Sequence, residues 1–133
     1  MNADILYTFE NGARYFRCPI CKGKVELKRQ SLVCANNHSF DIAKQGYINY
    51  IMGKKQFKNY DKESFESRKT ILDKGYYGHI LDELIGIIES LGKCTSILDV
   101  GCGEGYYARN IVEATDKDVI AFDISKDSVQ LAA

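Results

Sequence analysis

The sequence predicts an α/β chain in two parts, a small β-module held together by a metal and then the opening of an alternating strand–helix unit. Three observations predict this. Four residues with zinc-ligand spacing lie near the N-terminus, a glycine-rich turn follows a short β-rich run near the C-terminus, and the net charge changes sign between them. The 133 residues suffice for one domain or one and a half.

The overall composition is typical of a soluble globular protein. Hydrophobic residues make up 45% of the chain and charged residues 27%. The longest apolar runs, such as residues 119–122, have four residues, so no membrane span is expected. The first six residues contain neither a basic nor an apolar stretch, so a secretory signal is not expected either. We therefore expect a cytoplasmic protein.

The net charge of zero is the sum of two oppositely charged halves. Residues 1–60 contain 10 Lys and Arg against 4 Asp and Glu, together with 9 of the 15 Phe and Tyr, whereas residues 61–133 contain 8 against 14. Basic charge interleaved with aromatic rings is typical of a nucleic-acid surface. The same lysines and arginines could equally keep a small module soluble. The asymmetry indicates two modules more firmly than it indicates RNA.

The cysteines indicate a zinc site. Their number, five, is odd, which argues against a disulfide framework. The series Cys18-x2-Cys21-x12-Cys34-x3-His38 has the spacing of a tetrahedral zinc ribbon. Four protein ligands leave no open position on the metal, so the zinc is expected to be structural, and a module of about 30 residues would need it to fold. The alternatives are redox chemistry and buried free cysteines.

Two tight turns and a hairpin are expected to form this ribbon. Pro19 and Gly23 suit the first turn, and the asparagines before His38 can take left-handed conformations in the second. Between the turns, Val25 and Leu27 alternate with charged residues, and a polar turn then leads into a second short β-run, as in a hairpin.

The middle of the chain is expected to change from loop to helix. Residues 40–51 can pack on the ribbon, and residues 54–60 form a basic linker that either contacts phosphate or stays solvated. From Asp61 the spacing becomes helical, and Gly75 ends a first helix. A second helix, ended by Gly92, has one apolar face, made of Leu81, Leu84, Ile85, Ile88 and Leu91.

A glycine-rich loop lies between two predicted strands in the second half. Residues 96–100 are a short β-rich run that leads into the loop Gly101–Gly105, and a helix is expected over residues 106–114. A second, buried strand over residues 119–123 ends in Asp123, and Ser125 opens another helix. This order is the opening of a Rossmann-type nucleotide site, in which the acid after the second strand accepts hydrogen bonds from ribose hydroxyls.

The glycine spacing differs from that of the phosphate-binding motifs. Tyr106 stands where the third glycine of a dinucleotide fingerprint belongs, and the Lys-Ser/Thr pair of a P-loop is missing. The loop instead resembles motif I of class I S-adenosylmethionine (SAM) methyltransferases, which cradles the methionine and ribose parts of the cofactor. Asp99 and Glu104 suit a cationic sulfonium better than an anion, although Asp99 could simply brace the loop.

Several motifs together resemble the 23S rRNA guanine-N1 methyltransferase family, from about Cys18 to the last residue. They are the Cys-Pro-x-Cys…Cys-x3-His ribbon, Phe40-Asp41-Ile42-Ala43-Lys44-Gln45-Gly46-Tyr47-Ile48-Asn49, Arg68-Lys69-x-x-Leu72-Asp73-x-Gly75-x-Tyr77, and Leu98-Asp99-Val100-Gly101-Cys102-Gly103-Glu104-Gly105-Tyr106-Tyr107. The resemblance implies a zinc-ribbon RNA-binding module over residues 1–53 and a basic linker over 54–60. Residues 61–133 would be the helical lead-in and N-terminal part of a Rossmann-like, SAM-binding methyltransferase domain with an incomplete sheet.

The resemblance also implies ligands, an activity and partners. The implied zinc ligands are Cys18, Cys21, Cys34 and His38. The residues expected to bind SAM are Tyr77, Asp99, Gly101, Gly103, Glu104, Gly105, Tyr106 and Asp123. The implied reaction is methyl transfer from SAM to N1 of a guanine in a 23S rRNA hairpin loop, and a homodimer is compatible with it.

One departure from the family pattern limits these expectations. The family's domain has seven strands, whereas this chain ends after the second expected strand, so the target-guanine pocket and any catalytic base lie outside it. We expect the chain alone to be inactive and name no catalytic residue. Two other functions stay open, a zinc-dependent RNA-binding or regulatory module without catalysis, and a SAM methyltransferase that acts on a small molecule or a protein.

Overall fold

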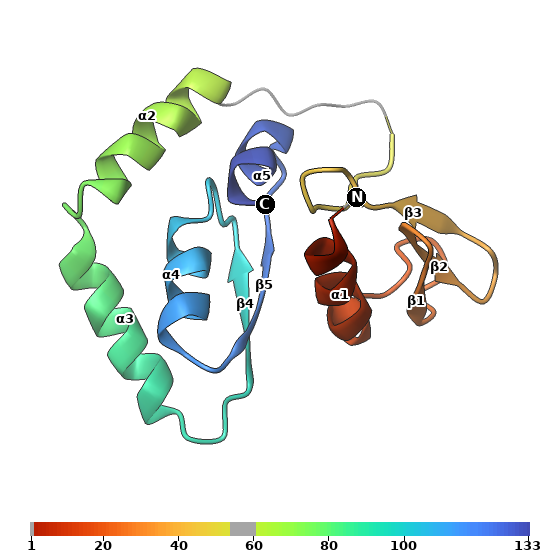
Figure 1. Cartoon of the computed structure of the whole chain (residues 1–133), viewed down its shortest axis with the longest axis horizontal. Helices are drawn as coiled ribbons and strands as arrows, with labels where there is room; N and C mark the ends of the chain where they lie inside the picture. Colours follow the sequence, from red (N-terminus) through yellow and green to blue (C-terminus); the bar gives the residue numbers. More distant parts are fainter. Residues whose placement is uncertain (1, 54–60) are drawn as a thin grey trace. The chain divides into compact units, whose positions relative to one another are not determined.

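The computed structural model describes residues 2–53 and 61–133, and each of these two ranges forms a compact unit (Figure 1). Each unit has its own hydrophobic core. The basic linker expected over residues 54–60 lies outside the described residues.

The first unit is a three-stranded antiparallel ribbon with a helix packed against it. Its elements are α1 (Ala3–Gly12), a 3-10 turn (Ala13–Tyr15), β1 (Val25–Lys28), β2 (Ser31–Cys34) and β3 (Ser39–Asp41), and the strand order is β1-β2-β3. The hairpin expected between the two tight, ligand-bearing turns, here called knuckles, is confirmed as β1 and β2. These strands pair from Val25↔Cys34 to Lys28↔Ser31. Its two-residue turn begins at Arg29, whose φ of 57° lies in the left-handed region.

Two elements of this unit were not expected from the sequence. Helix α1 is capped by Asn2, whose side-chain oxygen accepts the backbone N–H of Asp4 at 3.1 Å, and it buries Phe9 against the ribbon. Strand β3 pairs with β2 and places Phe40 opposite Leu32, so that both side chains are buried. Strand β3 is only three residues long, which is too short to produce a recognisable alternation.

The second unit is a parallel strand pair with helices beside it. Its elements are α2 (Lys62–Asp73), α3 (Gly78–Ser90), β4 (Ser96–Val100), α4 (Tyr106–Ala114), β5 (Asp118–Phe122) and α5 (Lys126–Ala132). Strands β4 and β5 pair in parallel through the α4 crossover, from Ser96↔Asp118 to Val100↔Phe122. Gly75 follows the end of α2 with a φ of 82°, as a C-terminal glycine should.

The expectation that the second strand is buried is wrong. Side chains alternate between the two faces of the pair, and α3 and α4 cover the face that carries Ile97 and Val119 (Figure 1). The opposite face stays open, because Leu98, Val100 and Phe122 are 60%, 65% and 47% exposed. Leu91, expected on the inner face of α3, is also exposed, since α3 ends one residue before it.

Candidate metal centre and glycine loop

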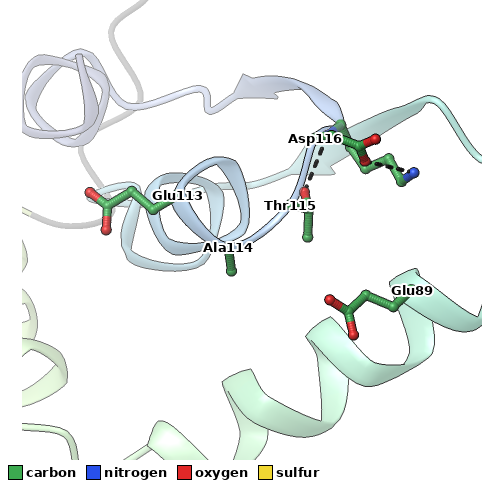
Figure 2. A pocket seen from close by; sticks show the side chains of 6 residues that line it. Glu89, Glu113, Ala114, Thr115 and Asp116 are labelled. Carbon is green, nitrogen blue, oxygen red and sulfur yellow. Dashed lines mark hydrogen bonds and ion pairs between the residues drawn. The ribbon is translucent and has the colours of Figure 1, made fainter.

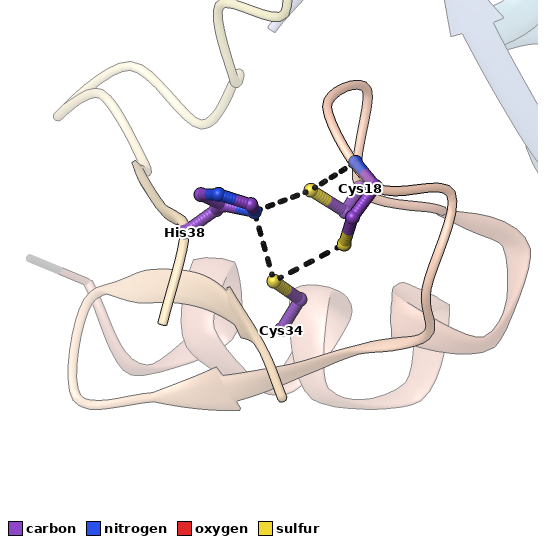
Figure 3. Close-up of side chains that lie close together, drawn as sticks. Cys18, Cys34 and His38 are labelled. Atoms are coloured by element: carbon purple, nitrogen blue, oxygen red, sulfur yellow. Dashed lines mark hydrogen bonds between the residues drawn. The ribbon is translucent and has the colours of Figure 1, made fainter. Parts of the chain in front are cut away.

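The four predicted zinc ligands converge at one point of the ribbon. Figure 3 shows Cys18, Cys34 and His38 with their side chains pointing toward one another. Their ligand atoms all lie within 4.8 Å of one another. The Nδ1 atom of His38 is 3.5 Å from the Cys18 Sγ and 3.4 Å from the Cys34 Sγ, and the Cys21 and Cys34 Sγ atoms are 3.7 Å apart. Zinc–sulfur bonds of about 2.3 Å and zinc–nitrogen bonds of about 2.0–2.1 Å put tetrahedral ligand atoms about 3.5–3.8 Å apart. The cluster therefore has the dimensions of a closed zinc site.

Backbone hydrogen bonds in the first knuckle orient its two thiols, those of Cys18 and Cys21. The Lys22 N–H donates to the Cys18 carbonyl at 2.8 Å, and the Cys18 N–H donates to the Gly23 carbonyl at 2.9 Å. Lys22 takes the left-handed conformation, with a φ of 62°, rather than Gly23. A Cβ at Gly23 would lie 3.4 Å from the Cys21 sulfur, so a side chain there would be in close contact with the metal cluster.

The second knuckle is held by backbone hydrogen bonds of the same kind. The Asn37 N–H donates to the Cys34 carbonyl at 2.9 Å, and the Cys34 N–H donates to the His38 carbonyl at 3.1 Å. Asn37 has a φ of 61°, which confirms the expectation that an asparagine here is left-handed. Both knuckles therefore form from local sequence, and the pairing of β1 with β2 brings them together.

The protonation of the cluster favours a metal cation. The pKa of the Cys21 thiol is lowered to about 6, first by hydrogen bonding from the Gly23 backbone and next by His38, so that this group is largely a thiolate at pH 7. Burial raises the pKa of the Cys34 thiol. A zinc ion would supply the positive charge that stabilises a second thiolate, at the buried Cys34.

The glycine loop joins β4 to α4 and is built on left-handed backbone. Gly101, Gly103 and Gly105 have φ values of 75°, 57° and 81°. The N–H groups of Gly101 and Cys102 donate to the Phe122 carbonyl at 2.9 and 3.1 Å, which fixes the start of the loop to the end of β5. Only glycine adopts such a series of conformations at low cost.

Gly105 is restricted further by α5. A Cβ at this position would lie 2.7 Å from the Cβ and 2.9 Å from the Cα of Ala132. The last turn of α5 therefore packs directly on the loop, and the absence of a side chain at Gly105 makes that packing feasible.

Asp123 holds the loop and the start of α5 together. One carboxylate oxygen accepts the Gly103 N–H at 3.0 Å, and the other accepts the Ser125 N–H at 2.8 Å. The sequence left open whether Asp99 simply braces the loop. In this structure it is Asp123 that holds the loop. Burial raises the pKa of Asp99, and the charges of Asp123 and Glu104 raise it further, so the structure gathers these three acids beside the loop.

The other predicted cofactor residues lie in different surroundings. Tyr106 is buried and packs with Leu72 and Ile111 in the core of the second unit. Tyr77 is 44% exposed and stands at the N-terminal cap of α3. Glu104 is buried, 2% exposed, and pairs with Arg68, a residue that sequence reasoning did not assign to the site. Only the motif Arg68-Lys69-x-x-Leu72-Asp73 pointed to this part of α2.

Cys102 lies inside the loop but is not a reactive thiol. Its pKa is raised to about 12, first by burial and next by the charge of Asp99. The group is therefore a neutral thiol at physiological pH, and we assign it no chemistry.

A hollow lies at the other end of α4 (Figure 2). The residues that line it are Glu89, Glu113, Ala114, Thr115, Asp116 and Lys117. Asp116 and Lys117 form an ion pair of 2.8 Å there. The hollow lies at the C-terminal end of α4, whereas the glycine loop precedes the N-terminal end, so the two are separate features.

A search of the described residues for a helix able to span a membrane finds none.

Two family models match the chain, in the predicted order. Residues 16–55 match the zinc ribbon described as "RlmA, N-terminal", and residues 91–133 match a model described as "Methyltransferase domain". The first match contains the four clustered ligands, and the second contains β4, the glycine loop, α4, β5 and α5. Each of the two sites described above therefore lies inside one of the two matched regions.

Relatives with assigned names match nearly the whole chain. The "23S rRNA (guanine(748)-N(1))-methyltransferase" of Streptomyces fradiae is 31% identical over 128 residues, which cover 93% of this chain and 46% of that protein. The "Putative 23S rRNA (guanine-N(1)-)-methyltransferase YxjB" of Bacillus subtilis (strain 168) is 32% identical over 128 residues, which cover 89% and 45%. A similarly named protein of Micromonospora griseorubida is 27% identical, with 90% and 47% covered. The predicted resemblance is confirmed, and the chain spans about half the length of these relatives.

Proposed function

We propose that this chain is the zinc-ribbon and cofactor-loop part of a SAM-dependent methyltransferase that modifies N1 of a guanine in a 23S rRNA hairpin loop. One observation carries the proposal. A closed Cys3His cluster and a strand–glycine loop–helix–strand–acid unit occur on one chain, in the order of the two matched families. The names of the relatives support rRNA as the substrate class.

The loop is suited to a ligand that carries positive charge and no phosphate. In this proposal, Gly101, Gly103 and Gly105 allow close approach of the backbone to SAM. Asp99 and Asp123 lie together beside the loop and would attract a sulfonium or ammonium group. Glu104 belongs to the same proposed site, but it is buried and paired with Arg68, so it would act by holding the loop. We also assign Tyr77 and Tyr106 to the cofactor site, Tyr106 through the core packing that orients the start of α4.

The chemistry of methyl transfer divides between the cofactor and the protein. When bound, SAM supplies a methyl group activated by its sulfonium centre, which guanine N1 accepts while losing its own proton. The residues of this chain bind and orient, because positioning of the reacting atoms in line provides much of the acceleration. No described residue is assigned the base that takes the N1 proton.

In this proposal the ribbon unit binds the RNA. Its exposed basic side chains include Arg17, Lys22, Lys24, Lys28 and Arg29. Neutral salt competes with contacts of this kind, because each phosphate that is neutralised releases condensed counterions. The lysines at 54, 55 and 58, for which the sequence left open phosphate contact or solvation, lie outside the described residues.

Replacing Lys22, Lys24 and Lys28 together by Gln should weaken binding of a 23S rRNA hairpin. The slope of log affinity against log salt should flatten by roughly 0.7–0.9 for each phosphate that the variant no longer neutralises. Filter binding at several salt concentrations measures both quantities, and zinc content should stay unchanged because no ligand is altered. The matched control replaces Lys62, Lys74 and Lys126 of the second unit by Gln. Equal affinity and slope for the ribbon variant and the parent chain would remove these lysines from the RNA surface.

The chain by itself should not methylate RNA. One face of the β4–β5 pair is open, and the chain spans about half the length of its relatives, so we expect SAM to be bound weakly or not at all. Transfer of labelled methyl groups from SAM to the hairpin tests this directly. Turnover by the 133-residue chain would contradict the prediction. Failure of the chain to retain the hairpin would instead favour a methyltransferase with a small-molecule or protein substrate.

A further inference from the structure

Glu104 is in an unusual electrostatic position. It is the only charged side chain among the described residues that is buried, with 2% of it exposed. It directly precedes Gly105, the N-terminal cap of α4. A carboxylate removed from water is strongly disfavoured unless a positive charge or hydrogen bonds replace its hydration. Glu104 therefore needs a partner from elsewhere in the fold.

Arg68 of α2 is that partner. Its Nε atom lies 3.3 Å from the Oε2 atom of Glu104, and this oxygen accepts no hydrogen bond from the described residues. Charge attraction to Arg68 is therefore what offsets the burial of this oxygen. Asp99 and Asp123 add two more carboxylates nearby. Among the described residues, Arg68 is the one basic side chain within ion-pair distance of any of the three acids.

A second ion pair fixes α2 against the other side of the loop. The Asp73 Oδ1 atom accepts from the Arg109 guanidinium at 2.8 Å, and the Arg109 backbone N–H donates to the Gly105 carbonyl at 2.9 Å. Lys69 donates to the other oxygen of Asp73 at 3.1 Å. Helix α2 therefore forms one ion pair with Glu104, the residue before Gly105, and a second ion pair with Arg109 in the first turn of α4.

We infer that Arg68 is a positioning residue of the glycine loop, which acts by neutralising Glu104 and so keeps the loop in the conformation that receives the cofactor. The inference rests on the proposed function, because that function makes the loop a SAM site. Arg68 need not touch the cofactor, since its effect passes through Glu104. Helix α2 thereby becomes part of the cofactor site, although it precedes the strands that define the site.

Amide hydrogen exchange at the loop tests this inference without any cofactor. In the 133-residue chain the Gly103 N–H donates to Asp123 and the Gly105 N–H donates to the Cys102 carbonyl, so their exchange reports opening of the loop. Arg68→Ala should speed exchange at both amides roughly ten- to hundredfold, because the buried Glu104 carboxylate loses the positive charge that offsets its burial. The matched control is Lys62→Ala on the same helix, which removes an exposed pair with Glu66 and should leave both rates unchanged.

Removal of the charge on Glu104 separates positioning from general stability. In the double variant Arg68→Ala/Glu104→Gln, the rates should return most of the way to those of the parent chain, because no buried charge is left without a partner. A merely structural loss of Arg68 packing would not be rescued in this way. If Arg68→Ala does not fold, Arg68→Gln is measured instead with the same expected direction.

Two results would overturn the inference, namely loop exchange in the Arg68 variant equal to that of the parent, or a double variant that exchanges as fast as the single one. The proposed function fails separately. A chain that shows the coupling between Arg68 and Glu104, while its full-length relatives bind no SAM, would contradict the cofactor assignment and leave the positioning role intact.

Discussion

Removal of zinc by a strong chelator is expected to unfold the ribbon unit. Cys18 and Cys34 are 0% and 2% exposed, and they lie in the same core as Val25, Leu32 and Phe40. Without the metal, thiols gathered within 4.8 Å of one another would either repel as thiolates or be buried as unpaired polar groups. A unit of this size has little other core to compensate. Structural zinc in small fingers contributes about 10–16 kcal/mol, so this is the largest effect that we expect.

Metal analysis and circular dichroism measure this effect. The purified chain should contain one zinc per molecule, and His38→Ala or Cys21→Ser should lower both the zinc content and the stability of the ribbon. Cys94→Ser is the matched control, because Cys94 lies outside the cluster and its thiol donates to the Ser96 carbonyl. Well under one equivalent of zinc in undamaged protein, or an unchanged ribbon in His38→Ala, would refute the assignment.

Gly105→Ala is expected to destabilise the second unit more than any other glycine substitution in the loop. The new Cβ would lie 2.7 Å from the Ala132 Cβ and 2.9 Å from its Cα, so α5 must move, and a φ of 81° is itself unfavourable for alanine. The left-handed backbone costs about 1–2 kcal/mol and overpacking about 1–3 kcal/mol. The sum, about 2–5 kcal/mol, is a large part of the stability of a small domain.

Gly103→Ala separates the cost of the left-handed backbone from the cost of the contact with Ala132. Its φ of 57° is also left-handed, but a Cβ there would meet nothing within 4 Å. Chemical or thermal denaturation should therefore show a smaller loss of stability for Gly103→Ala, from the backbone alone. Equal losses in the two variants would show that contact between Ala132 and Gly105 is unimportant and that α5 does not depend on the loop.

Local sequence patterns predicted the site residues that lie close together in the chain. The zinc ligands fall in two short knuckles, so their spacing alone identified them, and the structure brings all four together. The glycine loop and α4 were predicted with correct bounds, and β5 within one residue, because each depends on its own periodicity and on nearby glycines. Two elements, α1 and the short strand β3, escaped prediction because their buried apolar residues are covered only once the ribbon has formed.

What the sequence by itself determined about this protein is thus the chemistry of each site, namely a Cys3His zinc ribbon and a glycine loop followed by an acid. Only the tertiary structure decided which side chains support those sites. It showed that Asp123, rather than Asp99, holds the loop, that Arg68 pairs with Glu104, and that Ala132 packs on Gly105. The reason is physical. Ligand spacing and helical period are local properties of the chain, whereas these contacts join residues 20 to 36 positions apart and depend on how the helices pack.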